Sequence, residues 1–136
     1  MSRQNRQLER EIARLHLTDS PTGGRGLAPC WEDADGRIVP TFNIVIGNKA
    51  FRAVPVWREP FTKRALAIAP LVEIADRPLN VRDFRRLAYR VMQHGRNHPD
   101  GACVYYANII DRTTTKQACK SQRRLVEGYF YPFSLR

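Results

Sequence analysis

The chain has 136 residues, of which 43% are hydrophobic. That length suits a single domain, over residues 1–136, which would bury roughly two-thirds of the surface that its unfolded chain exposes. No apolar run approaches the ~18 residues of a membrane span, and the polar start "MSRQNRQLER" lacks the apolar stretch of a secretory signal. We therefore expect a cytoplasmic protein that needs neither disulfides nor metals to fold.

The charge balance is the most informative property of the composition. Lysine and arginine total 23 against 13 acidic residues, which gives a net charge of +10, and 19 of the basic residues are arginine. A GC-rich genome would explain arginine in place of lysine, but not the excess itself. The excess predicts a polyanionic partner, nucleic acid first, because the planar guanidinium group suits phosphate.

The three cysteines, Cys30, Cys103 and Cys119, are odd in number and have no motif spacing. This pattern favours reduced thiols in a reducing compartment over a disulfide framework.

The first predicted element is a helix over residues 5–16, in which Leu8, Ile12 and Leu15 share one face. The stretch "TDSPTGGRG" collects turn formers. Residues 1–17 would therefore form a semi-detached N-terminal helix, joined to the rest by a flexible connector over residues 18–29. The segment "TGGRG" is not a P-loop, and Arg25 within it is either a loop residue or part of a basic arm.

A period of two from Arg37 predicts a hairpin, "RIVPTFNIVI" returning through "AFRAVPVW" after the turn "GNK". Pro40 and Pro55 each remove a ladder donor, so we expect an edge or a bulge at each. The segment "RALAIAPLV" is a third strand or, since alanine is neutral on that choice, a short buried helix.

Residues 80–95, "NVRDFRRLAYRVMQHG", predict an amphipathic helix with Asn80 as its N-cap and Gly95 as its C-terminal stop. On a helical wheel, one continuous apolar arc contains Val81, Phe84, Leu87, Ala88, Val91 and Met92. The opposite arc is centred on Arg82, Arg85, Arg86 and Arg90.

A strand, "ACVYYANII", and a last helix over residues 114–130, capped by Asp111 or Thr113, complete the order α-β-β-β-α-β-α. This order predicts an α+β fold, with amphipathic helices on one face of a three- to four-stranded, mostly antiparallel sheet. The run helix, three strands, helix is similar to the double-stranded-RNA-binding module in element order only.

The basic helix faces are the candidate nucleic-acid-binding site. Solvated helix faces normally mix signs, whereas the central helix has one acid among four bases and the last helix has one, Glu127. The candidate residues are Arg82, Arg85, Arg86, Arg90, Lys116, Lys120, Arg123 and Arg124. They form one phosphate-binding surface if the two faces point the same way, and ordinary solvated faces if they do not.

Aromatic residues offer a weaker signal. Tyr129, Phe130, Tyr131 and Phe133 near the C-terminus either close the core, stack on unpaired bases or contact a second copy of the chain. We favour the core. The neighbours Tyr105 and Tyr106 lie on one strand, so one should point outward.

No catalytic or metal centre stands out. His94, His98, Asp100 and Cys103 are close in sequence but lack zinc-ligand spacing, and the first two would share a helical face only if the helix ran through Gly95. Glu32, Asp33 and Asp35 either form a turn or bind a divalent ion. Their negative charge would raise the pKa of the Cys30 thiol, so it would not activate this thiol as a nucleophile. Cys103 and Cys119 fall near apolar faces, as structural thiols do.

The sequence thus predicts a small, basic, non-enzymatic nucleic-acid-binding protein without a cofactor, in the cytoplasm or a mobile genetic element. The alternative is a protein-binding accessory factor, an inhibitor or assembly subunit, whose basic faces meet an acidic partner. A third is a small metal-dependent enzyme acting on nucleic acid through Glu32, Asp33 or Asp35.

Overall fold

The structure is a computed structural model that describes residues 27–133. Four strands form its main sheet in the order β3 (Phe51–Pro55), β2 (Phe42–Ile46), β5 (Tyr106–Asp111), β6 (Tyr131–Pro132). β2 and β3 form the predicted antiparallel hairpin, but β5 runs parallel to β2 and β6 parallel to β5. The α+β prediction is consistent with the structure, whereas the prediction of a mostly antiparallel sheet is wrong, because the sheet is mixed.

The expected third strand is helical. Most of residues 64–72 lie in α2 (Thr62–Leu66) and α3 (Ala69–Ile74), and these two helices bury Ala65, Leu71 and Ile74. Pro70 lies at the start of α3, where its missing N–H is tolerated. Since the segment directly after the hairpin forms helices and not a strand, the chain returns to the sheet by a crossover, which makes β5 parallel to β2. The likeness to the double-stranded-RNA-binding module in element order is lost with that strand.

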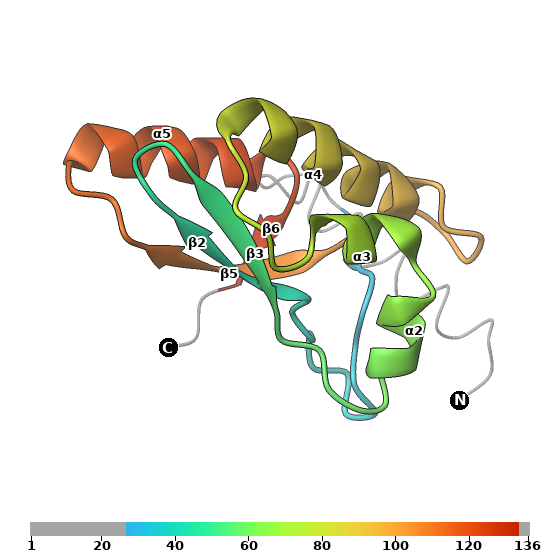
Figure 1. Cartoon of the computed structure of the whole chain (residues 1–136). Helices are drawn as coiled ribbons and strands as arrows, with labels where there is room; N and C mark the ends of the chain where they lie inside the picture. The colour runs from blue at the N-terminus through green and yellow to red at the C-terminus, as the bar shows by residue number, and fades with distance from the viewer. Residues whose placement is uncertain (1–26, 134–136) are drawn as a thin grey trace.

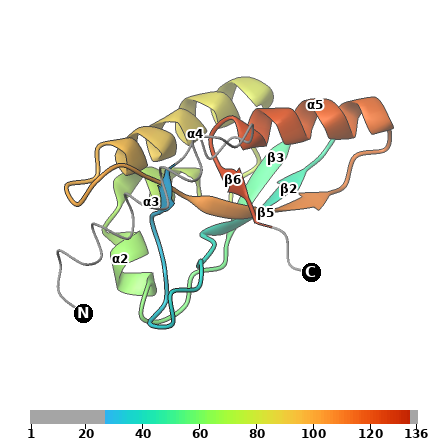
Figure 2. The ribbon, with the colours of Figure 1, turned by 180° about the vertical axis from the view of Figure 1, so that it is seen from behind.

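Helices α4 (Val81–Arg96) and α5 (Lys116–Glu127) lie on one face of the sheet (Figure 1). The same arrangement is seen from behind in Figure 2. Along β2 the burial alternates, with Phe42, Ile44 and Ile46 fully buried. The ring of Phe84 in α4 stacks on Phe51 with 4.5 Å between the ring centroids. This core fixes which faces of α4 and α5 are turned away from the sheet.

Two partly buried polar contacts join distant segments. The Gln122 side chain in α5 is 6% exposed and donates to the backbone oxygens of Gly47 and Asn48 in the hairpin turn. On the sheet, the Asn108 side chain of β5 donates to the Asn43 oxygen of β2 at 2.8 Å. Each contact joins elements that are more than sixty residues apart.

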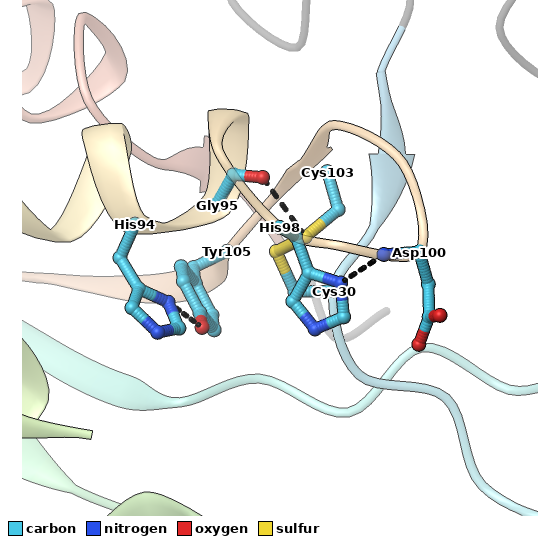
Figure 3. Close-up of a disulfide and its surroundings, with 7 residues drawn as sticks. All are labelled: Cys30, His94, Gly95, His98, Asp100, Cys103 and Tyr105. Carbon is cyan, nitrogen blue, oxygen red and sulfur yellow. Dashed lines mark hydrogen bonds between the residues drawn. A yellow bond between two sulfur atoms is a disulfide. The ribbon is translucent and has the colours of Figure 1, made fainter.

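A second, two-stranded sheet pairs β1 (Ala28–Pro29) in parallel with β4 (Cys103–Val104). Beside it, Cys30 and Cys103 form a disulfide with 4.9 Å between their Cα atoms (Figure 3). The expectation of three reduced thiols is therefore wrong for these two, and Cys119 alone is free. The pairing of β1 with β4 brings the two cysteines into range, and nothing in their sequence spacing predicts it.

The ends of the helices partly match expectation. Asn80 caps α4, since its side chain accepts from the Asp83 N–H at 2.8 Å. Gly95 does not stop the helix, which continues to Arg96; it is buried instead, against Cys103. The cap of α5 is Thr115, not Asp111 or Thr113.

Several predictions lie outside the described residues. They are the N-terminal helix over residues 5–16, the semi-detached segment 1–17, Arg25 and the connector 18–29 as far as residue 26. Of that connector, Ala28 and Pro29 form β1. No helix within residues 27–133 is both long and apolar enough to cross a membrane.

The disulfide closes a long loop, with 73 residues separating Cys30 from Cys103. Chain-entropy arguments assign such a loop about 4 kcal/mol of stabilisation. We therefore expect the C30S/C103S double variant to lose about that much unfolding free energy in a urea titration, with Cys119→Ser close to wild type. Thiol counting on the denatured, unreduced protein should find Cys119 alone; a count of all three cysteines would contradict the bond.

Gly95→Ala should destabilise the protein although alanine is the better helix former by about 1 kcal/mol. The added Cβ would lie 2.5 Å from the Cys103 carbonyl oxygen and 3.2 Å from the Cys30 sulfur. Such overpacking costs about 1–3 kcal/mol, which thermal denaturation would detect. In the control Gly47→Ala, the new Cβ comes no closer than 3.4 Å to a neighbour, so its effect should be smaller. An equal or stabilising effect at Gly95 would contradict the contact.

Candidate nucleic-acid interface

The sequence of α4 divides its surface into two. Its buried residues are Phe84, Leu87, Ala88, Val91 and Gly95. The first four recur at the spacing of one helical face, so the intervening positions must point away from the sheet. Those positions include arginine five times within one 16-residue helix. The local pattern therefore places these arginines on the outer surface of α4 once its apolar face is packed on the sheet.

The structure brings together the four predicted arginines of α4. They line one hollow of about 700 Å³, which we call the arginine hollow. Its lining residues are Val81, Arg82, Arg85, Arg86, Tyr89, Arg90 and Tyr129. Tyr129 follows the end of α5, and its ring meets Phe84 edge-on at 6.5 Å. Val81, which the wheel placed on the apolar arc, is 38% exposed and belongs to this surface.

The four predicted residues of α5 are exposed but do not line the arginine hollow. They are Lys116, Lys120, Arg123 and Arg124. Because α4 and α5 cover the same face of the sheet, their outer sides open to the same side of the molecule (Figure 1). Arg123 pairs loosely with Glu127 at 3.8 Å, one turn along the same helix.

Ion pairs neutralise the α4 arginines unequally. Arg90 contacts the Glu73 carboxylate of α3 directly, and Arg86 lies 3.9 Å from Asp83. Within residues 27–133, Arg82 and Arg85 take part in no ion pair. Exposed pairs of this kind contribute little to stability, so they mainly lower the local charge. The positive charge of the arginine hollow is therefore concentrated on Arg82, Arg85 and the loosely paired Arg86.

A second hollow of about 380 Å³, the histidine hollow, lies further along α4 and shares Tyr89 and Arg90 with the first. The other lining residues are Pro70, Gln93, His94, Asn97, His98 and Pro99. Sequence analysis missed this hollow because its lining comes from α3, α4 and the loop that follows. The one available signal was Tyr89, an aromatic residue on the basic arc of the wheel.

The histidine hollow is less cationic than its neighbour. His94 Nδ1 lies 2.8 Å from the Tyr105 hydroxyl (Figure 3). Burial, and then the nearby charge of His98, lower the pKa of His94 from its ordinary value of 6.5, so its ring is neutral at pH 7. Burial raises the pKa of Tyr105 to about 12, which keeps its hydroxyl protonated.

Comparison with known proteins found no matching family model, curated protein or solved structure.

The aromatic predictions divide. Phe130 is core, as favoured, at 1% exposure. Tyr131 and Phe133 are half-buried against Tyr106, with 4.7 Å between the ring centroids of the two tyrosines. Because this packing covers Tyr106 and the core covers Tyr105, both are buried. The expectation that one of them points outward is wrong.

The acidic segment is a turn. The Asp33 carboxylate accepts from the backbone N–H groups of Asp35 and Arg37, and Glu32 bridges Ile38 across the turn. Helix α4 runs through Gly95 but ends at Arg96, so it includes His94 and not His98. No group of three metal-ligating side chains is found in the part of the chain that the structure describes.

We expect the His94 ring to titrate below pH 6.5 in an NMR titration, because burial disfavours its charged form. His98→Gln should raise the His94 pKa only in part, since it removes the charge of His98 but not the burial. A midpoint at or above 6.5 in the wild type would contradict the packing of His94 against Tyr105.

Proposed function

We propose that this protein binds nucleic acid without acting on it as an enzyme, and that the outer face of α4 contacts phosphate groups. The observation that carries the proposal is the arginine hollow, where Arg82, Arg85 and Arg86 gather around Tyr89. Each guanidinium presents a rigid fork of donors that matches phosphate oxygens. Neighbouring positions on a helix face are about 5–6 Å apart, so one stretch of backbone can meet several of them.

The basic side chains of α5 extend this surface in the proposal. Lys116, Lys120, Arg123 and Arg124 are exposed, and the helix that carries them, α5, covers the same face of the sheet as α4. They lie outside the hollow, so we assign them a weaker, less localised attraction for the polyanion. Such long-range attraction speeds encounter and falls with ionic strength.

A cytoplasmic location, in a cell or with a mobile genetic element, is part of the proposal because nucleic acid is abundant there. The Cys30–Cys103 disulfide is more typical of oxidising compartments. Alkylation of thiols at the moment of lysis, followed by mass spectrometry, would report whether the bond exists in the cell. A fully oxidised pair would argue against the cytoplasm and leave the binding proposal intact.

A second candidate is a protein partner with an acidic surface. Tyrosine and arginine are the residue types most enriched in the energetic centres of protein interfaces, and here Tyr89 and Val81 are exposed among arginines. In that case the protein would be an inhibitor or an assembly subunit, and it would not need to bind nucleic acid at all.

A salt titration of binding to mixed-sequence strands and duplex tests the first proposal. Affinity should fall steeply between low and moderate salt, and the R82A/R85A/R86A variant should make the negative slope of log K against log[salt] shallower by about 2–3. Each phosphate contact contributes about 0.7 on single strands and 0.9 on duplex DNA.

The matched control is R37A/K49A/R112A, which removes the same charge from exposed positions outside α4. It should change the slope by much less than the α4 variant. Equal effects would show that only net charge matters. No binding of either nucleic acid at low salt would end the proposal and leave the acidic protein partner.

A further inference from the structure

Tyr89 differs from every other aromatic side chain of residues 27–133. It is 50% exposed, whereas all the other phenylalanine, tyrosine and tryptophan residues of this range are buried or half-buried. Aromatic side chains carry large apolar area and are normally covered. An exposed one at the centre of a basic surface therefore needs an explanation, and core packing does not supply it.

The phenol of Tyr89 is held in place. Its hydroxyl accepts a hydrogen bond from the Gln93 side chain at 2.9 Å, one helical turn further along α4. It is also the aromatic ring shared by the two hollows, so the arginine hollow lies on one side of it and the histidine hollow on the other. A ring restrained in this way loses less freedom on binding than a mobile one.

The two hollows differ in chemistry. The arginine hollow has Arg82 and Arg85 without ion pairs in the described part of the chain, which suits phosphate. In the histidine hollow, Glu73 pairs with Arg90 and the His94 ring is neutral at pH 7 because its pKa is lowered. That hollow is within the size range of small-ligand sites, and its apolar Pro70 and Pro99 and polar Asn97 suit an uncharged, flat group with polar edges.

We propose that the partner is a single strand, with an unpaired base stacked on Tyr89 in the histidine hollow and the neighbouring phosphates on Arg82, Arg85 and Arg86. This inference rests on the proposed function. In a duplex each base is covered by its neighbours above and below, so Tyr89 has no base face to meet. Stacking on an exposed aromatic ring is tolerant of sequence and is the common mode of single-strand recognition.

The test measures the affinity of Tyr89→Ala for a short mixed-sequence single strand and for the matching duplex, by fluorescence anisotropy at the same series of salt concentrations for each variant. Single-strand affinity should fall about five- to hundredfold with an unchanged salt slope, and duplex affinity should hardly change. Tyr89→Phe keeps the ring and should retain nearly full affinity, while Tyr89→Leu keeps apolar area without a π face and should behave like Tyr89→Ala.

Photocrosslinking gives an independent readout. A single strand containing 4-thiouridine should crosslink to the tryptic peptide of residues 87–90, which contains Tyr89. Wild-type affinity in Tyr89→Ala, or an equal loss for strand and duplex, would overturn the inference. If binding still depends on salt through Arg82, Arg85 and Arg86 in that case, the proposed function stands; if neither nucleic acid binds, both fail.

Discussion

The burial of one face of α4 on the sheet determines the rest of the molecule. Phe84 stacks on Phe51, and Leu87 and Val91 continue the same stripe into the core. A helix with that face fixed has no freedom to rotate, so its remaining positions are committed to solvent. The arginines and Tyr89 are displayed together because the apolar period of α4 leaves them nowhere else to lie.

Local patterns were predictable and long-range ones were not. The β2–β3 hairpin, α4 with its Asn80 cap, and α5 follow from periodicity and capping within a few residues. Whether the sheet would be antiparallel or mixed depended on residues 64–72, where alanines at every second position are compatible with either a helix or a strand. In the structure α2 and α3 form here, with Ala65, Leu71 and Ile74 buried in the core. These helices replace the expected antiparallel strand with a crossover connection.

The candidate site was predictable to a similar degree. The wheel identified the arginines of α4, but not that Arg90 is partly neutralised by Glu73 from another helix. Nor could it identify the hollows on either side of Tyr89, since Pro70, Pro99 and Tyr129 come from separate segments. The disulfide has the same origin, because Cys30 and Cys103 meet only through the pairing of β1 with β4.

The amide pair between Asn43 and Asn108 has a consequence for how β2 and β5 find their alignment. No turn connects these parallel strands directly, so nothing local sets their register. Slippage by one residue would send the two amides to opposite sides of the sheet, and slippage by two would move them apart along the strands and break the contact between them. This polar contact among β-branched residues therefore favours one register of the central strand pair over several of nearly equal energy.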